Sequence, residues 1–361
     1  MSYTDDRLNK VVPYLVAASK GWAEGPISYQ VGLTHACVNH CVMCQHWQRP
    51  KGDAKGASLA PTAAMRSVLR EMRTMGAESV CFSGGEPMLH PDVWSFIGEA
   101  LPMQVGIITG GVGVAFKNPD LDLLRKCAWV RVSLDAVDGE TYYASRGPGF
   151  IDAIANTTLM AESQVPLGFG ITVHKLNADK LEDVLRFILY LKQNGALLES
   201  VRLWLVRGEA ELSITDAQAD RLSQRVLPML WSLEIKHVPT NAVELTQRLS
   251  VSKTKPELPE NAADLRCVVP LVHLYIDAQL RVFPCCIHAG DAEIEPPAPP
   301  IADLKMVTLQ QVWDMIRIAE KRRERDYGKH PACAGCTLRL YTINKGFADA
   351  KAAGLLSPHF L

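Results

Sequence analysis

The chain has 361 residues, of which 48% are hydrophobic and 21% charged, so it can bury a large core and is not intrinsically disordered. A net charge of −1 gives no sign of the basic surface that nucleic acid or an anionic membrane would bind. No apolar run approaches membrane-spanning length, and the first ten residues lack the apolar core of a signal peptide. We therefore expect a cytoplasmic protein without a nucleic-acid or membrane partner.

Short apolar segments alternate with helical segments along most of the chain. After a segment of helical character over residues 5–23, we expect strands over 27–36, 79–85, 104–111, 129–136, 166–174 and 200–208. Helical patterns cover residues 61–76, 90–103, 118–128, 150–164, 179–195 and 216–233. Strands that are apolar almost throughout and alternate with helices predict a parallel sheet covered on both faces. Six such units are too few for a full eightfold barrel, so we predict an α/β fold with a partial (β/α)6 TIM-like barrel.

A different pattern begins after a proline-rich, polar linker over residues 254–261. Residues 273–285 resemble a β-hairpin, and residues 308–325 show an amphipathic helical pattern. We therefore predict three parts. These are an N-terminal helical extension over 1–24, a barrel over 25–253, and a small hairpin-plus-helix domain over 254–361.

Ten cysteines are many for a chain expected in a reducing compartment, which favours metal or redox chemistry over disulfides. Cys37, Cys41 and Cys44 follow the first expected strand with the spacing C-x3-C-x2-C. Three thiolates suit an iron–sulfur cluster or zinc, and they leave one metal position open for an external ligand. A zinc knuckle and three incidental thiols are the other interpretations of this spacing.

Two further motifs follow expected strands: SGGEP at residues 83–87 and SLDA at residues 133–136. Glycine permits a close backbone approach, and a carboxylate suits an ammonium group. Alone, GGEP could be a turn before a helix, and Ser133 and Asp135 could merely cap a loop. Because the carboxyl ends of parallel strands meet at one rim, we expect both motifs to lie beside the cysteine loop.

Together, the cysteine loop, SGGEP and SLDA resemble the motifs of the radical S-adenosylmethionine (SAM) superfamily, over about residues 27–235. The resemblance implies that the three cysteines hold a [4Fe–4S] cluster whose open iron binds SAM, which is cleaved to a 5′-deoxyadenosyl radical. It implies SAM contacts by Gly84, Gly85, Glu86, Ser133, Asp135 and Arg146, although a surface position is an alternative for Arg146. Met43 stands where the family often has an aromatic residue against adenine, and Thr109-Gly110-Gly111 stands where many members have Thr-Asn-Gly.

A second set of cysteines, Cys267, Cys285, Cys333 and Cys336, would complete a four-thiolate site. Its surroundings resemble the SPASM and twitch extensions of the same superfamily, which implies one auxiliary [4Fe–4S] cluster. A structural zinc ion is the alternative. Cys286 is either a thiol that donates hydrogen to a substrate radical or a buried apolar filler. We expect the remaining Cys81 and Cys127 to be core residues.

These features predict a radical SAM oxidoreductase or epimerase with a flavodoxin- or ferredoxin-type electron donor. Only about 25 residues precede the first expected strand, too few for the leader-binding domain that many peptide-modifying relatives carry. We therefore expect a small hydroxylated metabolite of specialised metabolism, such as a sugar or aminocyclitol, as substrate. The alternative is a peptide-modifying maturase, either an epimerase or a cross-link former. A non-catalytic iron–sulfur or zinc protein is a remote alternative.

Overall fold

The computed structural model describes residues 23–44, 58–206, 210–233, 267–286 and 299–322, with the single residues 14, 17, 235 and 289 beside these ranges. Almost all of the expected N-terminal helix lies outside the described residues, as do the linker at 254–261 and the two cysteines Cys333 and Cys336.

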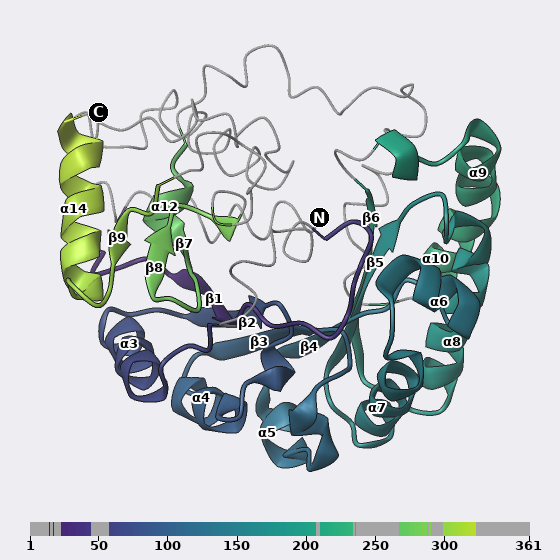
Figure 1. The fold of residues 1–361 in the computed structure, drawn as a ribbon, viewed down its shortest axis with the longest axis horizontal. Helices are drawn as coiled ribbons and strands as arrows, with labels where there is room; N and C mark the ends of the chain where they lie inside the picture. The colour runs from purple at the N-terminus through teal and green to yellow at the C-terminus, as the bar shows by residue number, and fades with distance from the viewer. Residues whose placement is uncertain are drawn as a thin grey trace.

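Six parallel strands follow one another in sequence order and form the body of the sheet. They are β1 (Ser28–Thr34), β2 (Ser79–Gly84), β3 (Gln104–Thr109), β4 (Trp129–Ser133), β5 (Leu167–Val173) and β6 (Leu198–Leu205). The connecting helices are α3 (Thr62–Thr74), α4 (Val93–Ala100), α5 (Leu121–Lys126), α7 (Phe150–Glu162) and α8 (Leu181–Gln193). Figure 1 shows the strands as an arc with these helices along its outer side. The predicted partial TIM-like barrel is confirmed.

Strand β5 shows how the sequence builds this arc. Leu167, Phe169, Ile171 and Val173 alternate along the strand and are fully buried in the main core. Alternate residues of a strand point to opposite faces, so the intervening Gly168 and Gly170 face the other side of the sheet. A Cβ atom at Gly170 would lie 3.0 Å from the ring of Trp204 on β6, so glycine leaves room there for that large side chain.

The helical segments differ from the prediction in two places. A short helix, α6 (Gly139–Arg146), follows β4 where no helix was predicted. The single helix expected over 216–233 is divided into α9 (Asp216–Arg221), a π-helical segment over Leu222–Val226, and α10 (Leu227–Ser232). Pro228 has no backbone N–H to donate four residues back, which accounts for the irregular turn just before it.

The predicted C-terminal hairpin is confirmed, and it continues the barrel sheet. Strands β7 (His273–Ile276) and β8 (Arg281–Phe283) pair antiparallel, and the short β9 (Ala302–Asp303) follows. Strand β7 also pairs parallel with β1, so the nine strands are ordered β6-β5-β4-β3-β2-β1-β7-β8-β9. The helix α12 (Val269–Val272) leads into β7. The sheet therefore runs across the linker at which we predicted a domain boundary.

The predicted amphipathic helix is present as α14 (Leu309–Arg322), which packs beside α3. Its Trp313 is fully buried and donates from Nε1 to the carbonyl of Ala23 over 3.4 Å. The backbone N–H of Gln310 donates to Glu71 on α3 over 2.9 Å. The C-terminal elements are thus fastened to the first helix of the barrel. Within the described residues, no helix is both long and apolar enough to cross a membrane.

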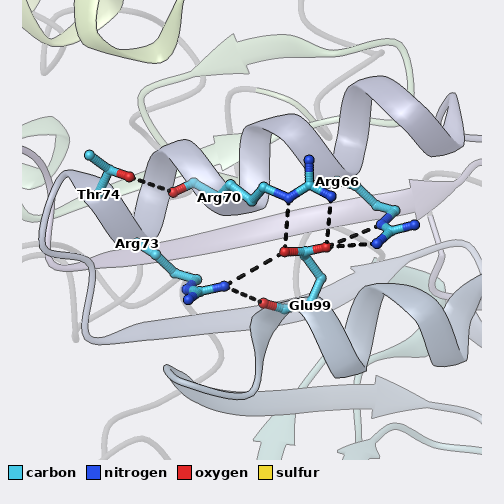
Figure 2. Close-up of polar contacts among 5 residues, drawn as sticks. All are labelled: Arg66, Arg70, Arg73, Thr74 and Glu99. Atoms are coloured by element: carbon cyan, nitrogen blue, oxygen red, sulfur yellow. Dashed lines mark hydrogen bonds and ion pairs between the residues drawn. The ribbon is translucent and has the colours of Figure 1, made fainter.

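An ion-pair cluster joins α3 to α4 on the outer layer of the barrel (Figure 2). The carboxylate of Glu99 accepts hydrogen bonds from Arg70 at 3.0 and 3.1 Å and from Arg66 at 3.1 Å. Arg73 lies 3.6 Å from the same carboxylate and also donates to the Glu99 carbonyl. The hydrogen bonds from Arg70 make the largest contribution to lowering the pKa of Glu99 below its ordinary value.

We expect Glu99→Gln to lower the free energy of unfolding at pH 7 by about 1 kcal/mol, because the three arginines are partly exposed and water screens them. A lowered carboxyl pKa stabilises the fold above the unfolded pKa of about 4.3, and this stabilisation is lost as pH falls through the folded pKa. Urea unfolding at pH 7 and at pH 3 measures the difference. Asp122→Asn, which removes a single exposed pair with Arg125, is the control. Equal stability of Glu99→Gln and the unaltered protein at pH 7 would contradict the prediction.

Candidate functional site

The cysteine loop begins where β1 ends and is fastened to the end of α6. The backbone N–H of His40 donates to the carbonyl of Arg146 over 2.8 Å, and that of Val42 donates to the carbonyl of Ser145 over 3.0 Å. A turn closes the loop, with the Cys44 N–H donating to the Cys41 carbonyl over 3.0 Å. The C-terminal end of helix α6 therefore fixes the position of the middle of the loop.

Helix α6 carries sequence signals that could have revealed it. Asp138 precedes the helix, and its side chain accepts from the N–H of Thr141 over 2.8 Å, which is an N-terminal cap. Gly147 ends the helix with a φ of 76°, a conformation that glycine adopts easily. The helix gives little periodic signal in the sequence, because it is only eight residues long and weakly amphipathic.

The glycine pair of SGGEP brings the end of β2 against the cysteine loop. Gly85 donates its N–H to the carbonyl of Thr34, and Glu86 donates its N–H to the carbonyl of Ala36, each over 2.8 Å. A Cβ atom at Gly85 would lie 2.2 Å from the Ala36 carbonyl oxygen, and one at Gly84 would lie 2.4 Å from that of Thr34. Glycine at these two positions therefore allows the end of β2 to lie close to the backbone of the cysteine loop.

Glu86 is a fully buried carboxylate at the carboxyl rim of the sheet. One oxygen accepts from the hydroxyl of Thr109 over 2.7 Å and from the N–H of Met88 over 3.0 Å, and the other accepts from the N–H of Gly110 over 2.7 Å. Burial raises the pKa of Glu86 to about 7, and these hydrogen bonds oppose the rise. A buried carboxylate of this kind favours a cationic partner, because the partner's charge would offset the cost of burial.

Asn39 is a site residue that the sequence analysis missed. It is buried between the two glycines Gly110 and Gly149, and its side-chain oxygen has no hydrogen-bond partner. A Cβ atom at Gly110 would lie 2.7 Å from Asn39 Nδ2, so the absence of a side chain at Gly110 makes room for Asn39. The sequence shows a glycine at position 110, but it does not show that Asn39 of the cysteine loop lies beside this glycine in the fold.

Asp135 and Arg146 form a buried ion pair beside the loop. Arg146 Nε lies 2.7 Å from Asp135 Oδ2, and Arg146 Nη1 donates to Cys41 Sγ over 3.7 Å. The other oxygen of Asp135 accepts from the N–H of Thr172 on β5 over 2.7 Å. Arg146 is only 7% exposed, so the surface position considered for it is wrong. Ser133 lies at the end of β4, two residues before Asp135, and is partly exposed.

The three thiols of the loop differ in exposure: Cys37 is exposed, and Cys41 and Cys44 are partly buried. Within the part of the chain that the structure describes, no three Cys, His, Asp or Glu side chains already converge on one point that would hold a metal ion. Three neighbouring thiols on one loop, beside a buried carboxylate and an unpartnered amide oxygen, are nevertheless a donor set that fits a cluster with a bound amino acid.

The C-terminal thiols are only partly described. Cys267 is partly buried and precedes α12, and Cys285 is buried at the end of the hairpin, but Cys333 and Cys336 lie outside the described residues. Cys286 is exposed, so it is not the buried filler that we considered. Met43 is partly exposed on the cysteine loop. The expected core position is confirmed for Cys127, whereas Cys81 on β2 is only partly buried.

Comparisons with known proteins agree with this geometry. Residues 31–188 match the family model described as the Radical SAM superfamily. Over 359 residues, the chain is 25% identical to the PqqA peptide cyclase of Gluconobacter oxydans (strain 621H), covering 92% of each protein. Over 173 residues it is 30% identical to the PqqA peptide cyclase of Xanthomonas euvesicatoria pv. vesicatoria (strain 85-10), covering 46% of this chain and 45% of that protein.

Solved structures show the same fold. Streptococcus suis SuiB bound to S-adenosylmethionine superposes with a TM-score of 0.61 at 15% identity, covering 91% of this chain and 75% of SuiB. The enzyme anSMEcpe with bound AdoMet and the Cp18Cys peptide gives a TM-score of 0.55 at 12% identity, covering 91% of this chain and 98% of that one. The matched segment 31–188 includes the cysteine loop, Glu86, Asp135 and Arg146. The chain therefore contains a radical SAM domain over residues 31–188.

Proposed function

We propose that this protein is a peptide-modifying radical SAM enzyme that forms a cross-link within a ribosomally made precursor peptide. The observation that carries the proposal is the end-to-end similarity to a PqqA peptide cyclase, which covers 92% of both chains. The similarity extends beyond the radical SAM domain into the C-terminal region, where the hairpin joins the barrel sheet. Such a match supports a shared kind of substrate better than a match to the domain alone.

The peptide substrate replaces the small metabolite that we expected from the sequence. The relatives favour the alternative interpretation, because two similar proteins are named for cyclising a peptide. Cross-link formation is also favoured over the epimerisation and alcohol oxidation considered first, since a cyclase joins two positions of its substrate.

The residues at the rim suit the cofactors that the family uses. Cys37, Cys41 and Cys44 would hold the cluster, and Glu86 would bind the ammonium group of SAM with an orientation fixed by its own hydrogen bonds. When bound, the cluster and SAM supply a radical that removes hydrogen from a substrate C–H. The chain's contribution is to position the peptide carbon and exclude water from the rim. Gly84, Gly85, Ser133 and Met43 are further SAM contacts in this proposal.

A second cluster belongs to the proposal. Cys267, Cys285, Cys333 and Cys336 would hold an auxiliary [4Fe–4S] cluster in the predicted domain 254–361. Forming a cross-link removes two hydrogen atoms from the peptide. The 5′-deoxyadenosyl radical would take the first, and the second would leave as a proton released to solvent and an electron that an oxidised auxiliary cluster would accept. In this scheme a flavodoxin- or ferredoxin-type protein supplies the electron that starts the cycle, and Cys286 is left without a required role.

The test is anaerobic incubation of the reconstituted protein with SAM, a low-potential reductant and a set of short precursor peptides that includes PqqA. We expect 5′-deoxyadenosine and a peptide that has lost two hydrogen atoms, seen by mass spectrometry as a decrease of about 2 Da. Iron counting beforehand should give about eight irons per chain, for two [4Fe–4S] clusters.

The control is the Cys37→Ala, Cys41→Ala, Cys44→Ala triple variant, which should retain about four irons and form neither product. If the peptide instead takes up deuterium from D2O and does not lose two hydrogen atoms, the reaction is epimerisation and not cross-linking. Production of 5′-deoxyadenosine with no change in any of the peptides would overturn the peptide proposal. About four irons, falling to none in the triple variant, would overturn the auxiliary cluster alone.

A further inference from the structure

Arg146 contacts a thiol of the cysteine loop directly. Arg146 Nη1 donates to the Sγ atom of Cys41 over 3.7 Å, within the range for a hydrogen bond to sulfur. Arg146 Nε lies 2.7 Å from Asp135, so one side of the guanidinium group is directed to the carboxylate and another to the thiol. Guanidinium is planar and always charged, and it can serve two partners at once.

This arginine is held in place from several directions. It is the last residue of α6, and its own carbonyl accepts from the N–H of His40 on the cysteine loop over 2.8 Å. Its partner Asp135 is fully buried and accepts from the N–H of Thr172, and the carbonyl of Asp135 accepts from the side chain of Asn177 over 3.0 Å. Backbone and side chain together hold Arg146 against the loop.

The charge of Arg146 acts directly on the thiol. The hydrogen bond from Nη1 places the positive charge of the guanidinium group against the Cys41 sulfur. The guanidinium group, which is itself buried, therefore stabilises negative charge on the Cys41 sulfur.

We propose that Arg146 raises the reduction potential of the cluster held by the N-terminal cysteines, by donating a charged hydrogen bond to the Cys41 ligand from a position fixed by Asp135. One-electron reduction by an external low-potential donor adds one negative charge to the unit formed by cluster and thiolates. A nearby buried cation stabilises this added charge, and hydrogen bonds to ligand sulfurs are a known determinant of cluster potentials. Asp135 is a positioning residue in this arrangement. The inference rests on the radical SAM domain and is independent of the substrate.

The first experiment compares reduction potentials in the absence of SAM. We expect Arg146→Met to raise the ratio of oxidised to reduced cluster about tenfold at a fixed potential, which is a shift of about 59 mV to more negative values for a one-electron couple. Arg146→Lys retains the charge without the planar fork and should shift the potential less. The signal that changes on later addition of SAM identifies the N-terminal cluster. An unchanged potential in Arg146→Met would mean that Arg146 serves only SAM or the fold.

The matched control is Arg131→Met, which removes another buried arginine of the barrel. Arg131 lies on β4, with its guanidinium 4.5 Å from the ring centre of Trp129 and 5.9 Å from that of Trp204. This variant should retain the iron content and the potential of the unaltered protein. A tenfold change of the same sign in Arg131→Met would show a general effect of lost buried charge and overturn the specific role of Arg146.

A second measurement decides the question if Arg146→Met fails to bind iron. The unaltered protein is labelled with 15N-arginine, reduced without SAM, and studied by electron–nuclear double resonance. A hydrogen bond from guanidinium to a ligand sulfur should give a 15N coupling to the reduced cluster, and this coupling should be missing in Arg146→Lys if it comes from Arg146. Absence of the coupling in the unaltered protein would overturn the proposal.

Discussion

Replacing Gly85 with alanine is expected to empty the N-terminal cluster site while leaving the barrel folded. The added Cβ atom would lie 2.2 Å from the Ala36 carbonyl oxygen, 2.7 Å from its carbon and 2.9 Å from the His35 carbonyl oxygen. All three are backbone atoms, so the loop must move away from β2 and lose its hydrogen bonds there. Overpacking of this kind costs about 1–3 kcal/mol, which corresponds to about a 5- to 160-fold loss of cluster affinity.

Iron and sulfide counting after anaerobic reconstitution measures this loss, and circular dichroism with thermal unfolding checks the fold. The matched control is Gly98→Ala in α4, where an added Cβ atom would meet nothing within 4 Å. Alanine is the better helix former, so Gly98→Ala should retain full iron content and gain up to about 1 kcal/mol of stability. Full iron content in Gly85→Ala would contradict the close approach of β2 and the cysteine loop.

Replacing Glu86 with glutamine is expected to weaken SAM binding about 10- to 100-fold. The carboxylate of Glu86 is the acceptor for two backbone N–H groups and one hydroxyl, and it carries the charge that we assign to the ammonium group of SAM. The amide of glutamine carries no negative charge. Its NH2 group would also face one of the donors that now give hydrogen bonds to Glu86, and that donor would lose its acceptor. Loss of a hydrogen bond to a charged group costs about 1.5–3 kcal/mol.

Equilibrium binding of SAM to the reconstituted, oxidised protein measures this effect. Glu99→Gln is the matched control, since it removes a carboxylate from the outer layer of the barrel and should leave the affinity for SAM unchanged. Iron content should stay the same in both variants, which separates loss of the ligand from loss of the cluster. Unaltered SAM affinity in Glu86→Gln would remove Glu86 from the binding site and leave it as a purely structural acceptor.

The arrangement of the barrel could be predicted from the sequence because its signals are local. The apolar strands and amphipathic helices of residues 61–205 repeat with clear periods, and each expected strand in this range is present. Helix α6 was missed because a short helix with a weak apolar face gives little periodic signal, although its cap at Asp138 and its final Gly147 were visible. Periodicity therefore identified the long elements, and only capping chemistry could have identified the short one.

The candidate site could be predicted as a set of residues and not as a set of contacts. The cysteine loop, SGGEP and SLDA each follow an expected strand. This position predicted that the three motifs lie at the same rim of the sheet. Pairing of Asp135 with Arg146, contact of Arg146 with Cys41, and the placing of Asn39 beside Gly110 join residues far apart in the chain. Such contacts depend on how strands and loops pack in three dimensions, which no single stretch of sequence determines.

The position of β1 inside the sheet affects how the protein matures. One edge of β1 pairs with β2, but the other pairs with β7, and His273 lies 245 residues after Ser28. At a synthesis rate of about 5–20 residues per second, that second edge stays unpaired for about 10–50 s on the ribosome. An open strand edge invites pairing with other chains. Arrival of the C-terminal hairpin is therefore a late step in protecting the cysteine loop, and changes that weaken β7 would lower iron occupancy at thiols that they never touch.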